Sequence, residues 1–164
     1  MKYLLLIFTF CFSVFGFSQN VNEEQANTNS DYYNQSERIL NYHSDIKVDV
    51  NGDLEVTETI KVNALEQNIR HGIFRTFLTE RQLNGKNQKV KYKIISVTRD
   101  GKTENYHTET GSGYYKIYIG SKETDLPAGQ YVFTITYKVA KQIGFFQKYD
   151  ELYWNVNGLD WDFP

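Results

Sequence analysis

Glu58 stands in a stretch whose alternating pattern would place a carboxylate inside a β-protein. Apolar side chains recur there at every second position, at Leu54, Val56, Ile60 and Val62. Glu58 falls on the same parity, and successive side chains of a strand point to opposite faces, so the pleat directs it toward the core. An unpaired carboxylate is costly to bury, so we expect Glu58 to be neutralised or to meet a cation.

Arg75 is a candidate for that cation. In an extended segment it would share a face with Ile73 and Phe77 and would also point inward. We therefore predict a structural ion pair between Glu58 and Arg75, in the interior or at its rim. The alternative is a bulge or a sheet edge that lets Glu58 reach water, because a slip of one residue reverses every side chain. Charged ends more than about 6 Å apart would exclude the pair.

Two pairs of carboxylates could be imagined as an acid–base site for hydrolysis: Glu123 with Asp125, and Asp150 with Glu151. A charged turn beside a strand is the ordinary explanation of both pairs. Zinc needs three or four converging ligands, and the histidines show no such spacing; they are His43, His71 and His107. We therefore expect no catalytic residue, no cofactor and no metal site.

Aromatic residues are abundant, with 13 Tyr, 11 Phe and 2 Trp. Packing in the core and between strands accounts for most of them. Two places are less easily explained: the expected loop pair Phe145 and Phe146, and Tyr153, which has the opposite parity to Trp154. Exposed rings in such places can stack on sugars or dock a protein, so these three residues are the predicted contact surface.

The elements that would position these residues are short strands separated by glycine turns. Residues 46–50 and 54–62 alternate around Asn51-Gly52, which predicts a hairpin with a type I′ turn. Further strands are expected at 90–98, 102–109, 114–119, 130–140 and 151–156, and no window shows a convincing helical stripe. The pattern indicates an all-β fold, an antiparallel β-sandwich of the immunoglobulin or fibronectin type.

The N-terminus indicates export. Residues 1–18 combine a positive start, a short apolar run and small residues before a cut between Ser18 and Gln19, which are the parts of a signal peptide. The apolar run is shorter than the ~20 residues of a spanning helix. Cys11, the only cysteine, lies in this leader, so the mature chain could form no disulfide. Residues 19–37 are polar and are expected to be a disordered tether, leaving 38–164 as the folded domain.

Several motifs in order give the chain a family resemblance; they lie at 49–59, 71–75, 118–120, 131–137 and 151–158. Together they resemble the domain-of-unknown-function family numbered 2207, the extracytoplasmic N-terminal region of predicted bacterial membrane proteins. The resemblance implies a signal peptide, an outward-facing β-domain and later transmembrane helices, but no known reaction. Relatives continue beyond Pro164. We therefore expect a fragment, with one sheet incomplete at the C-terminus and the membrane segments absent from this chain.

These observations favour a non-enzymatic module of a membrane-anchored envelope protein, with an interaction or structural role. Envelope proteins or cell-surface glycans would be its partners. A net charge of −2 gives no reason to expect a nucleic-acid partner, which normally requires a clustered basic face. Two alternatives remain open: a carbohydrate-binding or adhesion domain that uses exposed aromatic rings, and an extracytoplasmic hydrolase that uses carboxylates.

Overall fold

A computed structural model describes residues 36–83, 85–158 and 161. All of the regular structure in this part is β-strand, paired antiparallel, which confirms the predicted all-β class. Among the described residues, no helical segment has the length and hydrophobicity that spanning a lipid bilayer requires. The predicted signal peptide, its cut between Ser18 and Gln19, and residues 19–35 of the predicted tether lie outside the described residues.

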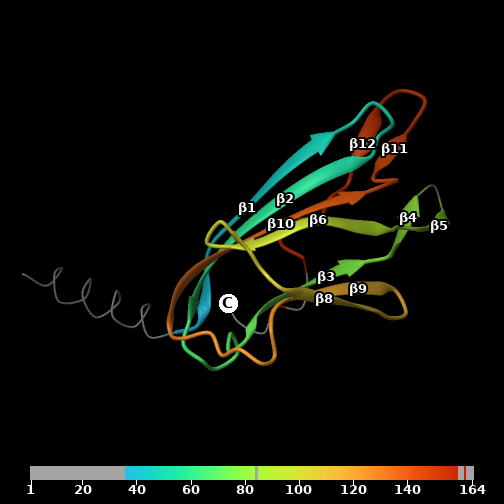
Figure 1. The fold of residues 1–164 in the computed structure, drawn as a ribbon. Helices are drawn as coiled ribbons and strands as arrows, with labels where there is room; N and C mark the ends of the chain where they lie inside the picture. Colours follow the sequence, from blue (N-terminus) through green and yellow to red (C-terminus); the bar gives the residue numbers. More distant parts are fainter. Residues whose placement is uncertain (1–35, 84, 159–160, 162–164) are drawn as a thin grey trace, which may run out of the picture. The chain divides into compact units, whose positions relative to one another are not determined.

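Sheet A has five strands in the order β1-β2-β10-β6-β7. Figure 1 shows β1, β2, β10 and β6 side by side. The long central strand β2 pairs with β1 on one side and with β10 on the other. A bulge interrupts the pairing of β10 with β6 between Thr136 and Tyr137. The bounds are β1 Arg38–Val48, β2 Leu54–Ala64, β6 Tyr92–Arg99, β7 Lys102–Thr103 and β10 Gly129–Val139.

Sheet B has three strands in the order β3-β9-β8, and two small hairpins complete the fold (Figure 1). The strands of sheet B are β3 Gly72–Leu78, β8 Tyr106–Thr110 and β9 Tyr114–Gly120. The hairpins pair β4 Glu80–Leu83 with β5 Lys86–Lys89, and β11 Ile143–Phe145 with β12 Asp150–Leu152.

The core lies between the inner faces of sheets A and B, so the arrangement is sandwich-like and is not closed into a barrel. Along β2, buried and half-buried residues alternate as the sequence predicted, and Val56, Ile60 and Val62 have no exposed surface. From sheet B, Phe77 reaches Tyr137 of sheet A, with ring centroids 4.8 Å apart. Burial of these side chains is the main source of stability.

The β1–β2 hairpin is present, but the predicted turn type is wrong. The connection runs over residues 49–53, and the backbone N–H of Gly52 donates to the Asp49 carbonyl at 3.0 Å. Gly52 has a φ of 78°, whereas Asn51 is not among the residues with positive φ that a type I′ turn requires. The Asp49 carboxylate accepts the N–H groups of Asn51 and Asp53, so it stabilises the longer turn.

Two strand predictions at the sequence level need correction. The expected strand 102–109 is divided, because the chain leaves sheet A after β7 and enters sheet B as β8. The expected strand 151–156 ends at Leu152, so Trp154 and Val156 lie in an irregular segment. This irregular segment, residues 153–158, covers part of the site described next.

Candidate functional site

Glu58 and Arg75 meet in the interior of the domain. Arg75 Nε donates to Glu58 Oε2 at 2.9 Å, and Arg75 Nη2 donates to Glu58 Oε1 at 3.1 Å. The two residues are 0% and 2% exposed. The fork of the guanidinium therefore holds both carboxylate oxygens, which is the strongest geometry for this pair of groups.

Strand register explains why the two residues meet. Glu58 lies in the middle of β2, opposite Ser44 of β1 and Ile135 of β10, so its side chain belongs to the inner face of sheet A. Arg75 lies in β3 opposite Ile117, whose side chain is also buried, and so belongs to the inner face of sheet B. The ion pair therefore joins the two sheets across the core.

Three further groups hydrogen-bond to the pair, one of which is the Thr76 carbonyl, which accepts from Arg75 Nη1 at 3.4 Å. Tyr137 Oη donates to Glu58 Oε1 at 2.7 Å, and Arg75 Nη2 also donates to the Val156 carbonyl at 3.0 Å. Burial, together with the neighbouring Glu58 carboxylate, raises the pKa of Tyr137, so its hydroxyl stays protonated. Burial opposes the charge of Arg75, but its hydrogen bonds to Glu58 and the charge of that carboxylate together raise the pKa of Arg75. We call Glu58, Arg75 and Tyr137 the buried cluster.

Aromatic rings and the C-terminal segment enclose the guanidinium. Arg75 Cζ lies 5.2 Å from the ring centre of Phe77 and 5.8 Å from those of Tyr42 and Trp161, distances at which a cation attracts a ring face. Gly158 packs so closely that a Cβ built on it would lie 1.5 Å from Arg75 Nη1. Glu58 has no exposed surface, so it cannot touch a substrate in this structure.

The three residues predicted as a contact surface lie at or near β11 and β12. Phe145 is 63% exposed at the end of β11, and Tyr153 is 77% exposed just after β12. Phe146 is half-buried and stacks on Tyr149, with ring centroids 4.9 Å apart. The ring of Phe145 also approaches Gly52, so the β11–β12 hairpin packs against the β1–β2 turn.

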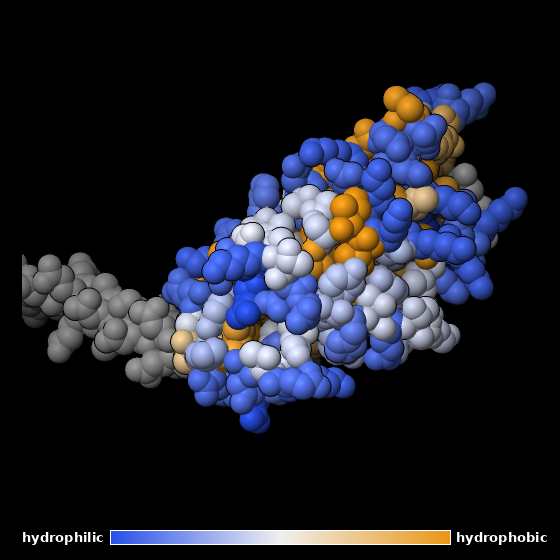
Figure 2. All heavy atoms as spheres, viewed as in Figure 1, coloured by the Kyte–Doolittle hydropathy of each residue, from blue (hydrophilic) through white to orange (hydrophobic). Residues whose placement is uncertain are grey.

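Hairpin and turn together expose a group of large apolar side chains that we call the apolar tip. Figure 2 shows hydrophobic residues at the surface at this end of the domain. Val50 is fully exposed, and Tyr149 is 58% exposed. The members of the apolar tip are Val48, Val50, Phe145, Tyr149, Leu152 and Tyr153.

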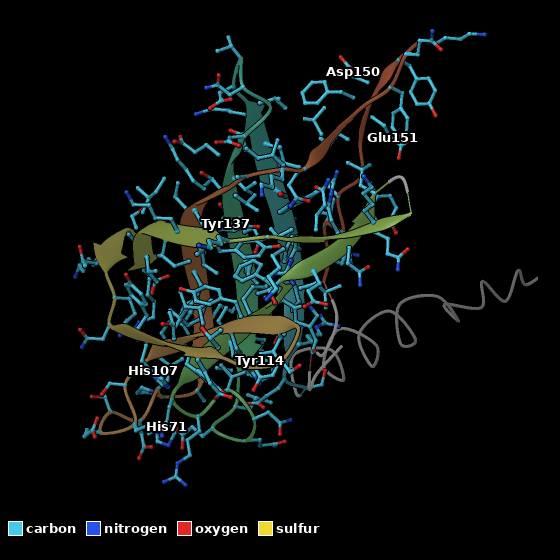
Figure 3. The ribbon with its side chains drawn as sticks, turned by 90° about the vertical axis from the view of Figure 1, so that its right-hand side faces the viewer. His71, His107, Tyr114, Tyr137, Asp150 and Glu151 are labelled. Atoms are coloured by element: carbon cyan, nitrogen blue, oxygen red, sulfur yellow. The ribbon has the colours of Figure 1, made fainter. Side chains whose placement is uncertain are left out.

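The carboxylate pairs are local features of the surface. Asp150 and Glu151 are successive exposed residues of β12, so the pleat turns their side chains to opposite faces (Figure 3). Arg70 Nε donates to Asp125 Oδ1 at 3.0 Å and lowers the pKa of that carboxyl. Glu123 accepts the Ser121 hydroxyl, and this hydrogen bond lowers its pKa.

The histidines do not converge on one site. His43 lies on the exposed face of β1, and His71 Nδ1 lies 3.4 Å from Asp125 Oδ1. His107 stacks on Tyr118, with ring centroids 4.7 Å apart. In the part of the chain that the structure describes, no three His, Cys, Asp or Glu side chains are grouped so as to hold a metal ion.

Glu37 is a buried carboxylate that sequence reasoning missed. It is 6% exposed and accepts the backbone N–H groups of Leu65, Gln67, Asn68 and Ile69 at 2.5–3.3 Å. Burial alone would raise its pKa, but these four hydrogen bonds lower it. Glu37 therefore ties the start of β1 to the loop before β3 and belongs to the folded domain, whereas composition had placed it in the tether.

Comparison with known proteins places this fold in a family. Residues 38–164 match the family described as "Predicted membrane protein (DUF2207) N-terminal domain". The chain is 32% identical over 138 residues to the "Uncharacterized protein YciQ" of Escherichia coli (strain K12). That alignment covers 84% of this chain but 22% of the relative, so the chain spans about a fifth of that protein. No solved structure matches. The chain belongs to the DUF2207 N-terminal domain family.

Proposed function

We propose that this domain is a non-enzymatic interaction module of a membrane-anchored protein and that it faces the outside of the cytoplasmic membrane. The description of the family as a predicted membrane protein and the leader-like residues 1–18 support this location. The observation that carries the interaction role is the apolar tip, whose aromatic members are more than half exposed.

The side chains of the apolar tip suit a protein partner. Contiguous exposed apolar groups are typical of interaction sites, and aromatic anchors supply much of the binding energy at protein interfaces. Phe146 and Tyr149 stack face to face on each other, so they do not form the flat, open platform on which a sugar ring would lie. A protein of the cell envelope is therefore the partner we favour.

Two features support a role without catalysis. The buried cluster has its carboxylate saturated by Arg75 and Tyr137 and closed to solvent. The exposed carboxylates of β12 point to opposite faces, although an acid–base pair for hydrolysis must face one substrate. The ion pair of the buried cluster thus serves to hold the fold.

Site-specific photo-crosslinking in cells tests the interaction role. A photoreactive amino acid replaces Phe145 in the full-length protein, and the matched control replaces Thr108, an exposed residue of β8. We expect one discrete protein adduct at position 145 that disappears with the additional change Tyr153→Ser. Adducts of equal yield at positions 145 and 108, or adducts that Tyr153→Ser leaves unchanged, would contradict the proposal.

Cysteine labelling tests the location. Lys102 is exposed at the tight turn between β6 and β7, so Lys102→Cys in a cysteine-free full-length protein gives one accessible thiol. We expect a membrane-impermeant maleimide to label it in intact cells freed of their wall, and the cysteine-free parent to stay unlabelled. Labelling only after the cells are lysed would place the domain in the cytoplasm.

A further inference from the structure

A small cavity lies beside the buried cluster, where β3, β4 and β6 meet the segment that follows β12. Its volume is about 110 Å³. A water molecule needs about 10–15 Å³ of such space, so the cavity has room for a group of several heavy atoms. Its wall is mainly apolar and aromatic and includes Leu78, Val90, Tyr92, Tyr153 and Trp154.

Two residues that line this cavity carry three buried hydrogen-bond donors with no acceptor among the described residues. The donors are Nε and Nη2 of Arg81 and Nε1 of Trp154. The third guanidinium nitrogen, Nη1, donates to the Gln142 carbonyl at 2.7 Å and so fixes the orientation of the group. Buried donors without an acceptor are costly, so this arrangement indicates that a ligand supplies one.

The buried cluster shows what such a ligand would be. Arg75 uses the same two nitrogens, Nε and Nη2, to hold both oxygens of Glu58. Arg81 offers the same fork, with no carboxylate of the described residues in a salt bridge with it. We propose that the cavity binds a carboxylate, with Arg81 holding its two oxygens and the Trp154 indole donating a further hydrogen bond.

The charge of the cavity and the residues that line it limit the kinds of ligand that can bind. The wall contains two cations, Arg75 and Arg81. Glu58 neutralises Arg75, whereas Arg81 forms no salt bridge with a described residue. Glu80 also lines the cavity, so the net positive charge of the wall is small. This balance favours a singly charged carboxylate over a phosphate dianion. The apolar wall favours a carboxylate on a small apolar carbon chain, which is found in free short-chain acids and at the C-terminus of a peptide. Tyr153 belongs both to this wall and to the apolar tip, so the proposed carboxylate site adjoins the proposed protein-binding surface.

Nuclear magnetic resonance of the ¹⁵N-labelled protein tests the proposal, because its two indole N–H signals differ in role. Trp161 Nε1 already donates to the Asn157 carbonyl, whereas Trp154 Nε1 is available to a ligand. The probes are propionate for a free acid, N-acetylalanine for a peptide end, N-acetylalaninamide as the uncharged control, and inorganic phosphate. We expect a saturable shift of the Trp154 signal with at least one carboxylate, and a smaller effect on the Trp161 signal. The preferred probe identifies the source of the carboxylate.

Variants assign the binding to the fork. Arg81→Gln should lower the affinity for the carboxylate by about tenfold or more, because charged hydrogen bonds are lost. Arg81→Lys should also lower this affinity, because an ammonium group lacks the two-nitrogen fork of a guanidinium. Arg70→Gln removes an exposed arginine elsewhere and should change nothing. If Arg81→Gln does not fold, Trp154→Phe is the second variant, because it keeps an aromatic ring but loses the N–H donor. Its weaker binding of the carboxylate is then measured from the shift of the Tyr153 amide signal. Equal shifts with the amide, binding of phosphate alone, or full affinity in folded Arg81 variants would overturn the proposal.

Discussion

At the scale of single residues, the fold depends on two buried carboxylates with different partners. Glu58 is neutralised by the charged side chain of Arg75, whereas Glu37 is held by backbone N–H groups alone. The Glu58–Arg75 pair could be predicted, because both residues occupy inward-facing positions in alternating apolar segments. The interactions of Glu37 could not be predicted, because almost every residue has a backbone N–H group and the residue types do not show where several of these groups converge. The same limit applies to Arg81, whose fork is seen only once the cavity around it is known.

Removing one partner of the buried pair should be far more damaging than removing both. Arg75→Met leaves the Glu58 carboxylate buried without a cation, which should cost about 3–5 kcal/mol of unfolding free energy. The double variant Glu58→Met/Arg75→Met removes both charges, so it should be more stable than either single variant. Urea unfolding gives these free energies. Glu55→Gln, which loses an exposed pair with Lys138, is the control and should cost no more than about 1 kcal/mol. A single variant no worse than this control would contradict the prediction.

Glu37 should make the free energy of unfolding of the domain depend on pH in the acidic range. Its pKa in the folded state lies below its ordinary value of 4.5. The stabilisation is therefore fully present above pH 4.5 and is lost as the pH falls through the lower folded value. Glu37→Gln should lower the unfolding free energy at neutral pH and flatten its decline in acid, as measured by denaturant unfolding across this range. Glu151→Gln, on exposed β12, serves as the control. An unchanged acid profile in Glu37→Gln would show that the loop does not depend on this carboxylate.

At the scale of elements, alternation predicted the long strands and failed at the short ones. β2 and β10 carry apolar residues at every second position and were recognised at nearly their full length. β4 and β5 are mostly polar and four residues long, so no period could reveal them. The segment after Leu152 alternates but leaves the strand conformation and packs Gly158 against Arg75. Contact with a buried charge, which is a tertiary effect, overrides the local pattern there.

Gly158 should be required for this segment to close over Arg75. Gly158 and Gly113 both have positive φ angles, 72° and 82°, so an alanine at either place carries a similar backbone cost of roughly 1–2 kcal/mol. A Cβ at Gly113 would meet nothing within 4 Å, whereas one at Gly158 would overlap the guanidinium. Gly158→Ala should therefore lower the unfolding free energy more than Gly113→Ala. Hydrogen exchange should also become faster around Val156 in that variant only. Equal effects of the two substitutions would show that the segment does not pack as described.

At the scale of the whole domain, a charged pair lies in the interior, whereas several large apolar side chains are exposed at the surface. The ion pair joins the inner faces of sheets A and B, while large apolar side chains stand in solvent at the β1–β2 turn and the β11–β12 hairpin (Figure 2). The first arrangement is explained by register and by the satisfied hydrogen bonds. The second has no explanation in the stability of the domain alone, which is why we assign it to a partner. The interior is therefore structural, and the apolar tip is the surface to which we propose to assign the function.

The most direct test of this assignment is the crosslinking yield at position 145 in the full-length protein carrying Glu58→Met/Arg75→Met. Circular dichroism and urea unfolding first establish that the double variant is folded. If the buried cluster is structural and the apolar tip carries the function, the yield and identity of the adduct should equal those of the parent protein. A folded double variant that has lost the adduct would contradict this account, because the buried charges would then be needed for the interaction itself.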